Sequence, residues 1–173
     1  MRIDPSLLRT PVEFLHAVHL REREICALLD RIADRARAAS GEIEAALRFL
    51  SDELPAHLDD EEQDLFPMLR ARCSDDDEID RLLDQLHADH CRASALTPRI
   101  TGIVGDAGSG LDAGDCDELR RYAGQSRRHL ILENAVLLPF ARLRLTPADL
   151  EQLRAAMTRR RSPRTTLEPK HAE

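Results

Sequence analysis

A histidine followed four residues later by a glutamate occurs twice in the 173-residue sequence. The first copy pairs His57 with Glu61, the second pairs His129 with Glu133, and a proline lies ten residues after each histidine. On a helix, side chains four residues apart lie on the same face, one turn apart. Each copy therefore offers an imidazole nitrogen and a carboxylate oxygen to one point in space, which is a pair of metal-binding donors.

Two histidines three residues apart precede each copy, His16 and His19 in the first half and His87 and His90 in the second. From the second histidine of each pair to the next His-x-x-x-Glu is 38 residues in the first half and 39 in the second. An offset this long indicates duplication of a helical hairpin and not a solenoid of short repeats. The sequence therefore predicts two similar halves, each made of two long helices.

Composition favours one soluble, all-α domain. Hydrophobic residues make up 42% and charged residues 33% of the chain, with four Phe, one Tyr and no Trp. Leu, Ala, Arg and Glu, which favour helices, dominate. The formal net charge of -7 argues against a nucleic-acid-binding surface. The sequence contains no apolar run long enough to span a membrane and no Cys-x-x-Cys pair. We therefore expect a cytoplasmic protein with reduced thiols.

Five helices are expected from apolar spacing and helix-start signals. Pro55 and Pro67 should kink the second helix, and Pro98 should bend the third. Residues 1–145 are predicted to form an antiparallel up-down-up-down four-helix bundle, and residues 146–173 a short helix followed by a disordered basic tail. A flexible loop is expected where glycines gather between the third and fourth helices. The expected helices cover about 11–38, 42–72, 78–104, 115–143 and 146–160, with the loop at 105–114.

Four histidines lie near the middle of the four long helices. With a rise of 1.5 Å per residue, an up-down-up-down bundle places them at the same height to within roughly one turn. Two glutamates join this layer, and six unpaired polar groups in a core would be costly. They exceed the four ligands of a tetrahedral Zn²⁺ site and suit two ions bridged by two carboxylates. The mixed donors favour iron, with Mn, Co or Zn as weaker options. The predicted ligands are His19, His57, Glu61, His90, His129 and Glu133.

The other histidines and a nearby acid are expected to play lesser parts. His16 and His87 should lie at the surface or bind a ligand side chain. Glu53, one turn before His57, has the same two options. Glu62 points about 100° away from its neighbour Glu61, so we expect it to be solvated.

Several polar residues could line a pocket beside the metals. Tyr122 and Gln125 lie on the same helix face as His129, where either could hydrogen-bond a ligand or a bound oxygen species. Core packing for Tyr122 and a surface position for Gln125 are the alternatives. Ser94 and Thr97 follow His90 on its face and could line a small pocket or fill space.

The doubled His-x-x-x-Glu, with His19 and His90, resembles the hemerythrin-like (HHE cation-binding) family over about residues 11–145. The resemblance implies a four-helix bundle with an oxo- or hydroxo-bridged non-haem di-iron site. It also implies a role in binding or sensing O₂, or in handling iron and reactive oxygen or nitrogen species. Oxygen-carrying hemerythrins add a fifth histidine in a His-x-x-x-His pair on the third helix. Here Leu86 and Ser94 stand on either side of His90, which implies one ligand fewer and more open coordination.

The leading hypothesis is a non-haem di-iron protein that binds or senses O₂ or redox state. The first alternative is an enzyme or iron-handling protein acting on peroxide or nitric oxide or in the repair of iron centres. The second is a structural bundle that holds Zn²⁺ or no metal. A sensor would need a protein partner, and a homodimer is compatible with the sequence. No separate acid, base or nucleophile is evident from the sequence to favour the enzyme.

Overall fold

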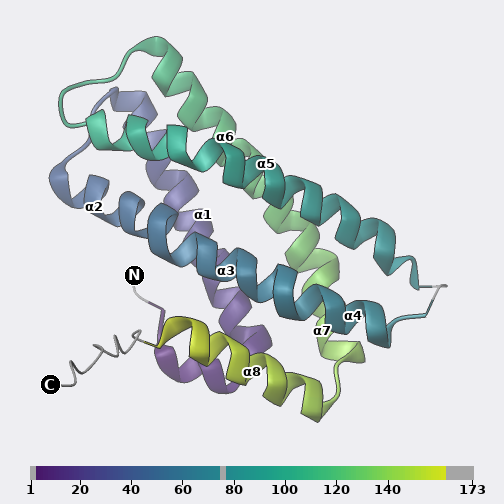
Figure 1. The fold of residues 1–173 in the computed structure, drawn as a ribbon. Coiled ribbons are helices and arrows are strands. Elements are labelled where there is room, and N and C mark those ends of the chain that lie inside the picture. The colour runs from purple at the N-terminus through teal and green to yellow at the C-terminus, as the bar shows by residue number, and fades with distance from the viewer. Residues whose placement is uncertain (1–2, 75–76, 163–173) are drawn as a thin grey trace, which may run out of the picture.

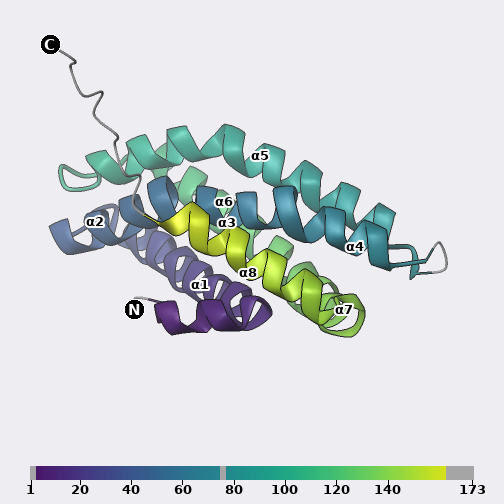
Figure 2. The same cartoon turned by 60° about the horizontal axis from the view of Figure 1, so that its bottom comes forward.

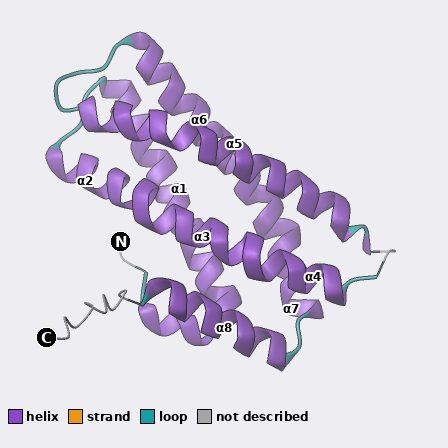
Figure 3. Ribbon diagram, in the orientation of Figure 1, coloured by secondary structure: helices purple, strands orange, loops and turns teal. Residues whose placement is uncertain are grey.

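The computed structural model describes residues 3–74 and 77–162, and in these ranges every regular element is a helix (Figures 1 and 3). Four long helical segments run antiparallel, and a fifth helix lies beside them. The predicted four-helix bundle with a short C-terminal helix is thus confirmed. The elements are η1 (Pro5–Arg9), α1 (Pro11–Arg35), α2 (Ser40–Arg48), η2 (Phe49–Glu53), α3 (Leu54–Asp60), η3 (Glu61–Leu65), α4 (Phe66–Arg72), α5 (Ile79–Asp106), α6 (Ala113–Leu132), η5 (Glu133–Leu137), α7 (Leu138–Arg144) and α8 (Pro147–Arg161).

The helix ends differ from the predictions by a few residues. Helix α1 stops early because Ala36 adopts the left-handed conformation, with φ of 50°. Helix α5 continues to Asp106, so the glycine-containing connection is shorter than the predicted loop. Pro98 lies inside α5, which is continuous around it. The predicted disordered tail lies outside the described residues, apart from the end of α8.

Three π-helical turns, η2, η3 and η5, interrupt two of the four long segments of the bundle. The second segment runs from α2 to α4 and contains η2 and η3, and the fourth runs from α6 to α7 and contains η5. Each π-turn directly precedes the α-helical turn that contains Pro55, Pro67 or Pro139, respectively. Proline has no N–H and its ring crowds the carbonyl four residues back, so the preceding turn widens to five-residue spacing. The kinks predicted at Pro55 and Pro67 are therefore π-turns. Two of the three turns begin at Glu61 and Glu133, the glutamates of the doubled pattern.

The apolar core consists of two clusters with a polar layer between them. On α1, Val18 belongs to one cluster and Ile25 to the other, with His19 between them. The same order holds on the second segment, where His57 and Glu61 lie between apolar residues of different clusters. The fold thus places its polar layer in the middle of the bundle.

Helix α8 lies along one side of the bundle, next to α1 and α3 (Figure 2). Thr146 caps its N-terminus by accepting a hydrogen bond from the Asp149 amide. Leu153 and Met157 are fully buried and belong to the same apolar cluster as Val18. In residues 3–74 and 77–162, no helix is long and apolar enough to cross a membrane.

Candidate metal centre

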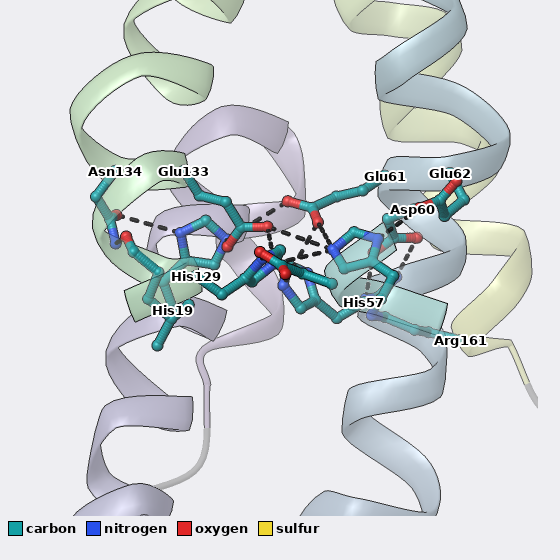
Figure 4. A network of polar contacts seen from close by, with 12 residues as sticks. His19, His57, Asp60, Glu61, Glu62, His129, Glu133, Asn134 and Arg161 are labelled. Carbon is teal, nitrogen blue, oxygen red and sulfur yellow. Dashed lines mark hydrogen bonds and ion pairs between the residues drawn. The ribbon is translucent and has the colours of Figure 1, made fainter. Parts of the chain in front are cut away.

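The bundle interior brings together all six side chains that the sequence predicts as ligands. Figure 4 labels all of them except His90. They form two groups of four, and within each group the ligand atoms lie within 4.8 Å of one another. Both glutamates belong to both groups, so the two groups share two carboxylates. One group is His19, His57, Glu61 and Glu133, and the other is Glu61, His90, His129 and Glu133.

The two oxygens of each shared carboxylate face histidines of different groups, and Oε2 of Glu61 also lies 3.9 Å from Nε2 of His57. Oε1 of Glu61 lies 3.5 Å from Nε2 of His19, and Oε2 lies 3.4 Å from Nε2 of His90. Glu133 does the same with Oε2 at 3.4 Å from His19 and Oε1 at 3.5 Å from His90. A carboxylate in this orientation can bridge two ions, one bound by each pair of histidines.

The carboxylates of Glu61 and Glu133 are completely buried. None of their four oxygens has a hydrogen-bond partner among the residues that the structure describes. Nε2 of His129 lies 2.6 Å from Glu133, but the approach is not aligned for a hydrogen bond. Because an unsatisfied buried charge costs several kcal/mol, ~3–5 when a partner is removed, these oxygens require nearby positive charge, either from metal ions or from protonated histidines. The donor set fits two metal ions better than it fits an apolar core.

The histidines and glutamates perturb one another strongly. Burial alone would raise the pKa of Glu61 and of Glu133, but the facing histidines outweigh it and hold both values below the usual range. Burial alone would lower the pKa of His19 and His90, but the two carboxylates raise these values to about 9 and about 11. Burial keeps the pKa of His57 below its usual range. Without metal, protons therefore neutralise much of the carboxylate charge.

Three of the candidate ligand histidines have their outer ring nitrogen, Nδ1, next to an acceptor. Nδ1 of His19 lies 3.2 Å from Oδ1 of Asn134, and Nδ1 of His129 lies 3.4 Å from Oδ2 of Asp89. Nδ1 of His90 has a carboxylate partner as well. Such contacts fix the ring so that Nε2 faces the interior, as is usual for metal-bound histidines. Asn134 and Asp89 each come directly after or before a residue of the predicted set.

Glu62 is the partner of His90, which corrects the expectation that Glu62 is solvated. Its Oε1 lies 2.6 Å from Nδ1 of His90, and its Oε2 lies 2.9 Å from Nδ1 of His87. Glu62 points away from Glu61 toward α5, where its partly exposed carboxylate contacts two histidines of that helix. His87 is exposed and contacts Glu62, which in turn contacts His90.

His16 and Glu53 are not members of either ligand group. His16 is half-buried on α1, one turn before His19. Glu53 lies 3.6 Å from the guanidinium of Arg21 and 3.5 Å from that of Arg48. Through these ion pairs Glu53 links α1 to the second segment of the bundle.

A cavity of about 300 Å³ lies beside His57, His90 and His129. Tyr122 and Gln125, which the sequence predicts near the centre, both line it. The Tyr122 hydroxyl lies 3.1 Å from Oγ1 of Thr97, so it is hydrogen-bonded although its ring is buried. Ser94 is exposed and does not line this cavity. The cavity gives a small ligand access to three of the candidate ligand histidines.

Glu22 also lines the cavity, and it is a residue that the sequence reasoning missed. It is only 6% exposed, and burial followed by the nearby charge of Glu133 raises its pKa to about 7. Contrary to the expectation from sequence, an acid–base group therefore lies next to the centre. The available signal was its position three residues after His19, which puts both on one face of α1.

The hemerythrin HHE cation binding domain matches residues 10–141. An uncharacterized protein of Haemophilus influenzae is 26% identical over 130 residues, covering 71% of this chain and 74% of that protein. No solved structure matches the chain. The family match covers most of the sequence, including both His-x-x-x-Glu copies, and the structure supplies two cation-sized groups of His and Glu donors. The chain therefore belongs to the hemerythrin HHE cation-binding family.

Proposed function

We propose that this protein is a non-haem di-iron protein whose centre binds or senses O₂ or redox state. The observation that carries the proposal is the set of four buried carboxylate oxygens without hydrogen bonds, shared between two pairs of histidines. Membership of a cation-binding family supports metal occupancy. Six imidazole and carboxylate donors favour two iron ions with an oxo or hydroxo bridge, with Mn or Zn as the less favoured occupants.

Each group of donors offers two imidazoles and two shared carboxylates. Iron bound there would supply a reversible change of oxidation state and vacant coordination positions for a small ligand. The chain holds the rings in place through Asn134, Glu62 and Asp89. Leu54 and Leu58 add apolar surface to a mainly polar cavity wall, and the cavity leaves room for O₂, peroxide or nitric oxide.

A specific observation favours the enzymatic alternative. Glu22 is a buried carboxyl in the cavity wall, and in the metal-free chain burial and the charge of Glu133 raise its pKa to about 7, which makes it a candidate proton donor or acceptor. A protein that only carries a neutral diatomic ligand does not need such a group. Chemistry on peroxide or nitric oxide, or iron handling in repair, would use it, because these reactions take up or release protons.

The deciding experiment is anaerobic loading with Fe²⁺, metal quantification, and optical spectra before and after air. We expect about two irons per chain, one for each donor group, and new near-ultraviolet bands on oxidation. Reversal when O₂ is removed would support carriage or sensing, and irreversible oxidation would support redox or repair chemistry. Failure to take up iron, with zinc bound or the site empty, would leave a structural bundle.

The location and partners are also part of the proposal. None of the four cysteines forms a disulfide in the described structure, which is compatible with the cytoplasm. A sensor would pass its state to a protein partner or a second copy of the chain. Size measurement of the iron-loaded and metal-free protein tests the second copy directly.

A further inference from the structure

Helix α8 lies beyond the residues that match the family, and its last turn reaches the metal layer. Arg161 donates from Nη1 to Oδ1 of Asp60 at 3.0 Å and from Nη2 to Oδ2, so it binds both oxygens (Figure 4). Arg160 donates to the same Oδ1 and to Asp64. Asp60 is completely buried, and the next residue in the chain is the shared ligand candidate Glu61.

The four charged groups form a closed network of two arginines and two aspartates. Both guanidiniums are mostly screened from water, with side chains 19% and 22% exposed. Arg161 is further held by stacking over Phe14, 4.7 Å from the ring centroid, and by the carbonyl of Met157 at 3.2 Å. A bidentate pair in this setting restricts orientation as well as supplying energy. The network therefore fixes the position of Asp60 relative to α8 and α1.

Asp60 directly precedes η3, the π-turn that starts at Glu61, and Asp64 lies within this turn. A π-turn is a local departure from α-helical hydrogen bonding, so its backbone depends on surrounding contacts. Oε1 of Glu61 faces His19 and Oε2 faces His90, and a rotation of η3 would withdraw both oxygens together. The contacts that hold η3 thus determine whether Glu61 can bridge.

We propose that Arg160 and Arg161 are positioning residues for the metal centre, holding η3 so that Glu61 faces both donor groups. This inference rests on the proposed function, because it requires metal at these groups. Its consequence is a coupling between metal occupancy and the docking of α8. Linkage is reciprocal, so the factor by which docking strengthens metal binding is also the factor by which metal strengthens docking.

The first test compares Arg161→Ala with Arg159→Ala. Arg159 lies in the same last turn of α8 and carries the same charge, but it is exposed and not in the network. We expect Arg161→Ala to lose about tenfold or more in metal affinity, measured by competition with a chelator, and to change the optical spectrum of the iron-loaded centre. Arg159→Ala should match the wild type. Arg161→Lys keeps the positive charge but lacks the guanidinium that binds both carboxylate oxygens, so its metal affinity should fall between those of the two alanine variants.

The second test uses the wild-type protein, so it does not depend on the folding of a variant. Amide hydrogen exchange is compared between metal-free and iron-loaded protein. We expect the amides of residues 153–161 to exchange more slowly in the loaded form, although this segment contains no proposed ligand. Far-UV circular dichroism verifies that each variant in the first test retains its helices.

The outcomes separate the two proposals. A wild-type protein that binds no metal under any loading condition would overturn both. A second outcome would overturn only the positioning role. In that case the wild type binds metal, Arg161→Ala and Arg159→Ala have the same metal affinity and spectrum, and hydrogen exchange in α8 is the same with and without metal. Should Arg161→Ala fail to fold, exchange in the wild type decides.

Discussion

His90 lies between two kinds of carboxylate. Its Nδ1 donates to Oε1 of Glu62 at 2.6 Å, while its Nε2 faces Glu61 at 3.4 Å and Glu133 at 3.5 Å. The ring also stacks on Phe66, with centroids 5.6 Å apart. A carboxylate on the outer nitrogen fixes the tautomer and raises the basicity of the inner nitrogen. Glu62 therefore prepares His90 to bind a cation.

Replacing Glu62 by Ala should weaken metal binding by about 10- to 100-fold, because Nδ1 of His90 loses its acceptor. His87→Ala is the matched control, since His87 binds the other oxygen of Glu62 from an exposed position. It should leave the affinity near that of the wild type. Chelator competition with iron-loaded protein measures both. Equal losses in the two variants would contradict this role of Glu62.

The shared carboxylates predict different metal contents for two ligand variants. His57 belongs to one donor group, so His57→Ala should leave about one ion per chain. Glu133 belongs to both groups, so Glu133→Ala should leave less than one. His16→Ala, at a half-buried position outside both groups, should keep about two. Metal analysis after gel filtration measures all three. Wild-type metal content in both ligand variants would refute the site.

The stability of the metal-free protein should fall as pH rises from 6.5 to 9. His19 has a folded pKa of about 9 and an ordinary value of 6.5, so its proton favours the folded state. Its contribution is fully present below about pH 6.5 and is lost as pH rises through 9. The loss is on the order of 3 kcal/mol from this group. His90, with a pKa of about 11, acts in the same direction at higher pH.

Urea unfolding of chelator-treated protein at several pH values measures this loss. The iron-loaded protein is the comparison, because ligand histidines must be deprotonated and its stability should not fall over the same range. A metal-free protein whose stability is flat or rises between pH 6.5 and 9 would show that the His19 proton does not stabilise the fold.

Glu22→Gln tests the acid–base group of the cavity. The amide keeps the shape of the side chain but cannot titrate, so the metal content should stay at the wild-type level. In the wild type we expect the rate of air oxidation of the iron-loaded protein to fall in one step with rising pH, as Glu22 loses its proton; bound iron offsets the charge of Glu133, so this step should lie below the metal-free pKa of about 7. The variant should lack this step. Stopped-flow absorbance measures the rates, with Gln125→Ala as a control at another cavity residue. An unchanged pH profile would remove Glu22 from the chemistry.

Periodicity and spacing were sufficient to predict the bundle and the meeting of the six candidate ligands. Helical rise is constant, so equal distances from the helix ends place His19, His57, His90 and His129 in one layer. It is harder to predict from sequence which side of each helix faces its neighbours. The sequence therefore predicts a solvated Glu62, whereas its carboxylate contacts His87 and His90 of α5.

The π-turns explain part of what the sequence could not show. Each turn adds a residue relative to an α-helix and so rotates whatever follows it. The sequence shows only the prolines Pro55, Pro67 and Pro139, which are equally compatible with a kink. The pairing of Asp60 with Arg161 joins residues 101 positions apart and has no local signal. Such contacts depend on how α8 packs against the bundle, and the spacing of apolar residues in the sequence does not determine that orientation.

The division of the core has a consequence for folding cooperativity. Apolar packing within each cluster is continuous, but across the middle of the bundle buried histidines and glutamates take the place of apolar packing. The metal-free chain thus resembles two half-domains on shared helices, each able to open by itself. Ions in the layer would cross-link these halves. Occupancy would then convert local opening at either end into global unfolding, so the metal would determine the size of the cooperative unit.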